Sequence, residues 1–260
     1  MASSRVAIVV CLFAGEKFGI PHSTGIYDAT WVDKLYNMVN RHTTIPFELI
    51  CLVDDTYPIQ APVTQIPFKE KLGADAGWAL MLEAYRPDLT NGYRLTLGLD
   101  TIICGNIDCY LTLSEKFAMV SDGYSHEPWV TRYPNYKNEV NNALTWCSPE
   151  SAKLIWDTWN NERDWVLKNC KLAPFDTVSE MVLLRKLFNK NGDVPRMDDI
   201  HAGIYSYKCH LLENKRHLSH IAPKIVYFHG SPKMNDLHPN IYKSNKHNRI
   251  VEDWLVKHWI

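Results

Sequence analysis

The segment YRLTLGLDTIICGNID, residues 93–108, places a carboxylate where a buried strand is expected to end. Its apolar run from Leu95 to Leu99 ends in Asp100 and resumes at Thr101. A continuous apolar run of this length is typical of a strand that is covered on both faces. We therefore expect Asp100 to lie at the C-terminal edge of a strand, where a ligand can reach it.

A second segment, KIVYFHGSPK at 224–233, ends another apolar strand with an imidazole, an unsubstituted backbone and a cation. The run Ile225–Phe228 is followed by His229 and Gly230, with Lys233 close behind. A hard divalent metal prefers carboxylate oxygen, with an imidazole tolerated for Mn²⁺, and a diphosphate is bound by the metal, backbone N–H groups and a lysine. Brought together, the two strand ends would hold a metal and a nucleoside diphosphate.

Both segments resemble the motifs of glycosyltransferase family eight, a group of GT-A enzymes with a YLDLDTVIVGNID-like Asp-x-Asp strand and a late FHGxPKP motif. The likeness extends to VAIVVCLFAGEKFG, to YNMVNRHTTIPFELICLVDD and to YSYK at 205–208. It implies an α/β fold: a single Rossmann-like GT-A domain over 1–260, with a mostly parallel central sheet flanked by helices. In it, 1–110 would bind the nucleotide and 111–260 the acceptor, with 224–233 returning to the donor site.

The resemblance implies an enzyme that transfers a sugar from a nucleoside diphosphate sugar, UDP-sugar above all, to a hydroxyl acceptor with retention of configuration. Asp100 and His229 would bind Mn²⁺ or Mg²⁺ as metal cofactor. Lys233 would stabilise the charge that grows on the leaving diphosphate, an electrostatic role with large catalytic leverage. A glycan or a lipid-linked sugar is the acceptor expected by default.

The chain departs from the family pattern at Gly98, where the first aspartate of Asp-x-Asp is expected. In the family, that position contacts the ribose and the metal, and the position matching Asp100 is the principal metal ligand. The departure leaves metal dependence open. It also leaves open a second class of function, a nucleotide-sugar-binding module with weakened catalysis, which would bind the donor without turning it over.

Further residues are expected around the donor. Glu180 stands where the family carries an Asp-Gln pair, so it is the candidate that faces the transferred sugar, and Asn142 resembles the start of a sugar-binding strand. The loop Ala14–Tyr27 would cover the base. The candidate catalytic residues are Asp100, Lys233 and Glu180, and the candidate donor-binding residues are Phe13, Ala14, Tyr27, Asp54, Gly98, Asn142, Gly230 and Lys233.

The elements that position these groups begin with a strand over Val6–Phe13. The spacing of Val32, Leu35, Tyr36 and Val39 then predicts a helix capped by Asp28, and Phe47–Val53 predicts the next strand. This strand–helix–strand order indicates a parallel sheet whose ligands lie beyond the C-terminal strand edges. Further strands are expected at 117–121 and 143–147, and helices at 74–85, 149–159, 177–189 and 250–258.

Composition limits the alternatives. A chain of 260 residues with 46% hydrophobic content can bury a large core, and no run approaches the ~18–20 apolar residues of a membrane span. The seven cysteines have no C-x-x-C or zinc spacing and indicate buried thiols in the cytoplasm. The apolar N-terminus is expected to be the first strand rather than a secretory signal. Dinucleotide-binding, P-loop and hydrolase motifs are missing.

Charge is distributed unevenly along the chain. The net charge is −1, whereas 207–260 holds nine Lys/Arg against four Asp/Glu, a net of +5. A basic region that also carries aromatic residues suits a nucleic acid, so a hydroxymethylated base in DNA is an alternative acceptor, met by Lys243, Lys246 and Arg249. A polar segment also carries four aromatic residues, which would stack on an acceptor or form a lid: Tyr124, Trp129, Tyr133 and Tyr136.

Overall fold

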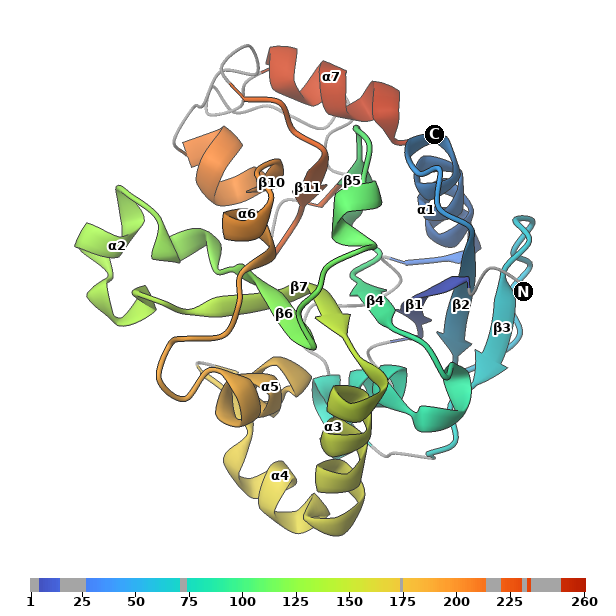
Figure 1. Cartoon of the computed structure of the whole chain (residues 1–260), viewed down its shortest axis with the longest axis vertical. Helices are drawn as coiled ribbons and strands as arrows, with labels where there is room; N and C mark the ends of the chain where they lie inside the picture. The colour runs from blue at the N-terminus through green and yellow to red at the C-terminus, as the bar shows by residue number, and fades with distance from the viewer. Residues whose placement is uncertain are drawn as a thin grey trace.

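Six strands form the central sheet of the computed structural model, which describes residues 5–14, 27–70, 74–173, 175–213, 221–230, 233–234 and 249–260. The strands are β1 (Val6–Leu12), β2 (Phe47–Val53), β3 (Thr64–Pro67), β4 (Arg94–Leu97), β6 (Phe117–Ser121) and β7 (Val140–Cys147). Their order is β3-β2-β1-β4-β7-β6 (Figure 1). All run in one direction except β7, which is antiparallel to both neighbours. This mostly parallel sheet confirms the predicted α/β fold class.

The first strand–helix–strand unit forms as the sequence predicts. The helix α1 (Ala29–His42) begins at Asp28, whose side chain accepts a hydrogen bond from Thr30 N at 2.9 Å. That bond satisfies one of the backbone donors that a helix start leaves unpaired. Strands β1 and β2 pair in parallel along their whole length, from Val6 opposite Phe47 to the last residue of each.

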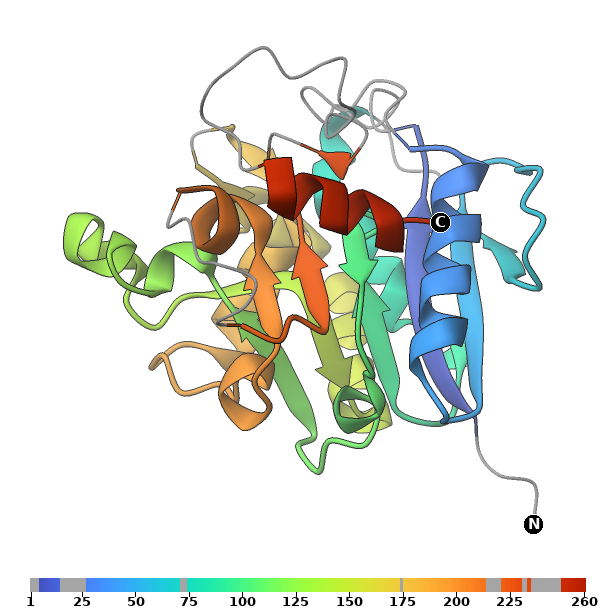
Figure 2. The ribbon, with the colours of Figure 1, turned by 90° about the horizontal axis from the view of Figure 1, so that it is seen from above.

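The sheet separates two hydrophobic cores. Side chains of β1 alternate between them, because successive residues of a strand point to opposite faces: Ile8 and Val10 join one core, Ala7 and Val9 the other. The first core holds α1 and residues of α7 (Arg249–His258). The second holds η2 (Ala74–Tyr85), α3 (Pro149–Asn161), α4 (Arg163–Asn169) and α5 (Glu180–Phe188). Figure 2 shows α1 and α7 in front of the sheet, on the side of the first core.

A second sheet of three strands lies over the first core, with the order β10 (Ile204–Ser206), β11 (Ile225–Tyr227) and β5 (Thr101–Ile103). The structure corrects the prediction of one strand that ends in Asp100 and resumes at Thr101, because the residues from Thr101 onward form β5 in this second sheet. The chain leaves the main sheet after Leu97, and Gly98 N makes a last bond to Ala143 O at 3.0 Å. The apolar pattern continues across this point because both strands are buried, so hydrophobicity alone does not reveal the change of sheet.

Three other boundaries differ from the predictions. The helix expected at 177–189 begins at Glu180, because β9 (Thr177–Val178) pairs with β8 (Lys171–Leu172) instead. The helix expected at 74–85 is a 3₁₀ segment with a break at Gly77. The strand expected at 143–147 begins three residues earlier and includes Asn142. The shorter elements are η3 (Pro87–Leu89), η4 (Asp108–Tyr110), η5 (Gly123–Ser125), α2 (Trp129–Arg132), η6 (Pro134–Tyr136), α6 (Met197–Ile200) and the π-helix η7 (Tyr207–Glu213).

All seven cysteines are free thiols; five are buried, whereas Cys11 and Cys109 are partly exposed. Within the described ranges, no helix is both long and apolar enough to cross a bilayer.

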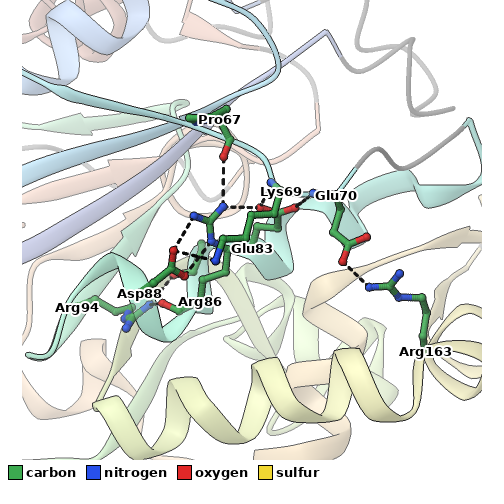
Figure 3. A network of polar contacts seen from close by, with 9 residues as sticks. Pro67, Lys69, Glu70, Glu83, Arg86, Asp88, Arg94 and Arg163 are labelled. Carbon is green, nitrogen blue, oxygen red and sulfur yellow. Dashed lines mark hydrogen bonds and ion pairs between the residues drawn. The ribbon is translucent and has the colours of Figure 1, made fainter.

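A buried ion network fastens the chain that follows β3 to η2 (Figure 3). The fully buried carboxylate of Glu83 accepts hydrogen bonds from Lys69 N at 2.8 Å, from Glu70 N at 2.7 Å and from Arg86 Nη1 at 2.8 Å. Arg86 also donates to Pro67 O at 3.2 Å. A buried carboxylate costs free energy unless its oxygens are paired, and here both oxygens are paired.

We expect Glu83→Ala to lower the free energy of unfolding by about 3 kcal/mol, because it leaves the buried Arg86 guanidinium without this partner. Urea titration measures the change. The matched control is Lys153→Ala, which removes an ion pair with Asp157 whose side chains are 65% and 45% exposed; it should cost less than about 0.5 kcal/mol. Equal small effects for both variants would show that the network does not stabilise the fold.

Candidate functional site

Strands β5 and β11 bring together the segments 93–108 and 224–233, in which the sequence predicts residues that bind a metal and a diphosphate. They pair in antiparallel register, with Thr101 opposite Tyr227 and Ile103 opposite Ile225. One residue further along, the backbone N–H of Phe228 donates to the carbonyl of Asp100 at 2.9 Å. The ladder therefore ends with the two predicted strand ends side by side.

The Asp100 carboxylate lies against a cation. Its Oδ2 accepts hydrogen bonds from Lys233 Nζ and from the Tyr27 hydroxyl, the latter at 3.1 Å, and Lys233 also donates to Phe228 O at 3.3 Å. The side chains of Asp100 and Lys233 are each 16% exposed. Burial, with the neighbouring Asp100 charge, raises the pKa of Tyr27 well above its usual value. The structure thus joins three of the predicted site residues in one contact.

His229 lies at the end of the neighbouring strand. Its Nε2 is 2.9 Å from Ser206 Oγ and 3.6 Å from Cys209 Sγ, and its ring meets the edge of Tyr124 at 5.8 Å between centroids. Burial lowers the pKa of His229, and the charges of Lys208 and Lys233 lower it further against the opposing effect of Asp122 and Asp100. Ser206 belongs to the YSYK segment that resembles the family, although that resemblance gave it no role, whereas no sequence pattern pointed to Cys209.

The residues at this edge do not fit a divalent metal well. Mg²⁺ is commonly held by one or two carboxylates, with substrate phosphates and waters completing its shell, but the one carboxylate predicted as a ligand here already binds an ammonium group. Gly98 contributes no ligand, and a Cβ there would lie 2.7 Å from Asp100 Oδ1. Among the residues that the structure describes, no group of three His, Cys, Asp or Glu side chains could hold a metal ion.

Glu180, predicted to face the sugar, is enclosed in the core. It is 2% exposed, and its carboxylate accepts hydrogen bonds from the Tyr85 hydroxyl at 2.8 Å and from Asn142 Nδ2. An adjoining cavity of about 10 Å³, lined by Cys11 and Thr96 among others, has room for about one water molecule. Burial raises the pKa of Glu180 to about 7. Sequence reasoning named Glu180 and Asn142 but missed Tyr85, which looks like an ordinary core residue.

The residues predicted near the base lie at the same edge of the sheet. Ala14 N is 3.4 Å from Asp54 Oδ2, and the Tyr57 hydroxyl donates to Asp54 Oδ1 at 2.7 Å. The Phe13 ring packs edge-on against Phe68 at 5.8 Å. Strands β1, β2 and β4 are parallel, so these positions and Gly98 follow their C-terminal ends. Of the loop expected to cover the base, residues 15–26 lie outside the described residues.

The four aromatic residues of the polar segment gather around Tyr124. Its ring meets those of Trp129, Tyr133 and Tyr136 at 5.8, 5.9 and 5.2 Å, in addition to His229. Figure 1 shows this segment, with α2, projecting from the ends of β6 and β7. At the base of this segment, the backbone N–H of Asp122 donates to the carbonyl of Glu139. The Arg185 guanidinium forms ion pairs with the side-chain carboxylates of the same two residues.

The basic residues proposed to meet DNA cannot be placed. Lys243 and Lys246 lie outside the described residues, and of Arg249 only the backbone, at the start of α7, is described. The described C-terminus docks on α1: Arg41 donates to the carbonyls of His258 and Ile260 at 2.8 and 3.0 Å. A DNA acceptor therefore stays a prediction.

The fold is shared with solved glycosyltransferases, whereas no protein family model and no curated protein sequence matches the chain. The apo form of GlyE from Streptococcus pneumoniae TIGR4 superposes with a TM-score of 0.61 at 13% identity, over 99% of this chain and 60% of GlyE. The bifunctional WbbM gives 0.57 at 11%, over 98% and 50%. The galactosyltransferase LgtC, in complex with donor and acceptor sugar analogues, gives 0.58 at 10%, over 97% and 95%.

These likenesses establish the fold. The chain has the GT-A architecture that the sequence resemblance implies, with its central sheet and flanking helices. It spans about 60% of GlyE and half of WbbM, but nearly the full length of LgtC.

Glu180 makes stability depend on pH. Its pKa of about 7 in the folded protein exceeds the ~4.3 of an unfolded glutamate, so the folded state binds more protons between these values. Stability therefore falls as pH rises from about 4 to 7. We expect Glu180→Gln, which cannot titrate, to gain stability relative to the natural protein across this window, by up to about 3 kcal/mol.

Urea unfolding at pH 5, 6, 7 and 8 measures this difference. The control is Glu162→Gln, because Glu162 is exposed and its replacement should shift stability by a similar small amount at each pH. A constant difference between Glu180→Gln and the natural protein across the four pH values would contradict the raised pKa.

Proposed function

We propose that this protein is a glycosyltransferase that moves a sugar from a nucleoside diphosphate sugar, with UDP as the carrier, to a hydroxyl acceptor. The observation that carries the proposal is the convergence of Asp100, Lys233 and Gly230 at one edge of the sheet. Parallel α/β sheets bind ligands beyond the C-terminal ends of their strands. The shared fold of GlyE, WbbM and LgtC supports the same reading.

The proposed nucleotide site begins at the ends of β1 and β2. There Phe13, Ala14 and Asp54 lie together, and a carboxylate such as Asp54 can accept hydrogen bonds from ribose hydroxyls or from a base N–H. From this point the diphosphate would extend towards Asp100 and Lys233, because β4 lies next to β1 in the sheet.

The proposed diphosphate site combines a cation with open backbone. Gly230 has φ of +65°, a conformation that favours glycine, and a Cβ there would meet no atom of the described residues within 4 Å. Among those residues, nothing crowds the backbone at this position, which lies three residues before Lys233 in the chain. Bare backbone N–H groups beside a lysine are a common way to bind phosphate.

In the proposed transfer, the acceptor oxygen forms a bond to the anomeric carbon while the bond from that carbon to the β-phosphate oxygen breaks. The bonding electron pair leaves with UDP, and the acceptor's hydroxyl proton passes to the departing phosphate oxygen. Lys233 stabilises the negative charge that appears on this oxygen, which lowers the barrier because the charge is greater in the transition state than in the donor. Attack on the face that the phosphate leaves gives the retention that the resemblance implies.

We propose a glycan or lipid-linked sugar as the acceptor. The exposed rings of Tyr133 and Tyr136 surround Tyr124, and Tyr124 contacts His229 beside the proposed diphosphate site. Aromatic rings offer flat apolar faces and polar edges, which suit the apolar face and hydroxyl rim of a sugar ring. A sugar bound there would approach the donor from the open side of this edge.

The test is a screen of nucleotide sugars by thermal unfolding, together with measurement of free UDP release, each with and without Mn²⁺. A true donor at a hundred times its Kd should add about 2.7 kcal/mol of stability, a shift of several degrees for a domain of this size. UMP, which lacks the β-phosphate, is the matched control and should stabilise less. If no nucleotide sugar shifts the transition under either condition, the proposal is wrong. Stabilisation without release of UDP from any donor would favour the binding module.

A further inference from the structure

We propose that the Lys233 ammonium takes the place of a divalent metal in this site, so that donor binding and transfer need no divalent cation. The inference rests on the proposed glycosyltransferase function and deepens it, because it assigns the charge that neutralises the diphosphate. It departs from the metal site that the Asp-x-Asp resemblance implies.

The first argument is the state of the Asp100 carboxylate. Its Oδ2 accepts hydrogen bonds from both Lys233 and Tyr27, and the two charged side chains are mostly removed from water. A metal ion bound to this oxygen would meet the ammonium charge at contact distance, where burial weakens screening. Binding a metal would therefore require Lys233 to move away from Asp100.

The second argument is the space at Gly98. A Cβ at this position would lie 2.7 Å from Asp100 Oδ1 and 3.9 Å from Ala143 O, and the backbone is held by the bond from Gly98 N to Ala143 O. A second carboxylate here would force Asp100 to turn away from its present position. Glycine thus removes a metal ligand and at the same time leaves room for Asp100 in the position that binds Lys233.

The third argument is the charge around His229, the other predicted ligand. Lys233 donates to the carbonyl of Phe228, the residue before His229, at 3.3 Å. Lys208 Nζ lies 5.9 Å from the centroid of the Tyr124 ring, and that centroid lies 5.8 Å from the centroid of the His229 ring. Two ammonium groups carry the same total charge as one Mg²⁺. They supply it without the octahedral oxygen shell that Mg²⁺ demands.

Asp100 then has a positioning role. Together with Phe228 O, it holds the ammonium at the end of β11 before the donor arrives, so little reorganisation is needed when a phosphate oxygen approaches. A charge-assisted hydrogen bond from Lys233 to phosphate would form in place of the metal–oxygen contacts.

Calorimetric titration of UDP into the full chain tests the proposal, once with EDTA and once with Mn²⁺. We expect dissociation constants that agree within about threefold. Tenfold or greater weakening in EDTA would overturn the inference and leave the glycosyltransferase proposal standing. Absence of UDP binding in both conditions would overturn the proposed donor itself, and the inference would fall with it.

Lys233→Ala provides a second measurement. In EDTA, we expect its affinity for UDP to fall by about 10- to 100-fold, the range for losing a hydrogen bond to a charged group. Lys168→Ala, which removes an exposed lysine from α4, is the matched control and should bind UDP as the natural protein does. Unchanged UDP affinity in Lys233→Ala would overturn the inference. If that variant fails to fold, the comparison of EDTA with Mn²⁺ on the natural protein still decides it.

Discussion

The pairing of β5 with β11 is the interaction on which the candidate site depends. It joins segments more than 120 residues apart, and its hydrogen bonds are obligatory because both strands are buried. Once the register is set, Phe228 N bonds to Asp100 O, and Lys233, five residues later, donates to Phe228 O and to Asp100 Oδ2. A one-residue slip would turn the side chains of β11 to the opposite face.

Two carboxyl groups beside the central sheet, those of Asp100 and Glu180, differ in the charge of the groups that they contact. Asp100 lies against the positive charge of Lys233, whereas the hydrogen bonds that Glu180 accepts within the described part of the chain come from the neutral donors Tyr85 and Asn142. Neutral donors offset less of the cost of burying a charge, and the pKa of Glu180 rises to about 7. The first arrangement suits binding of an anion beside a fixed cation. The second makes a core group that gains or loses a proton near neutral pH.

The residues proposed to bind the donor and those proposed to bind the acceptor lie on different parts of the fold. The proposed nucleotide contacts at Phe13, Ala14 and Asp54 follow the ends of parallel strands in the central sheet, which is packed on both faces. The aromatic residues around Tyr124 lie instead on a segment that projects between β6 and β7. A diphosphate site supported by core strands beside a projecting segment would allow the proposed acceptor contacts to vary while the transfer geometry is kept.

The sequence by itself determined the local elements and the candidate residues. Asp28 as a helix cap, β2 at Phe47–Val53 and the two motifs with Asp100 and Lys233 all follow from patterns within a few residues. Only the tertiary structure decided which side chains interact: Lys233 donates to Asp100, 133 residues away, and Tyr85 donates to Glu180. Apolar patterns report burial without identifying the partner across the interface. For the same reason, the change of sheet after Leu97 became visible only when the register of β11 was known.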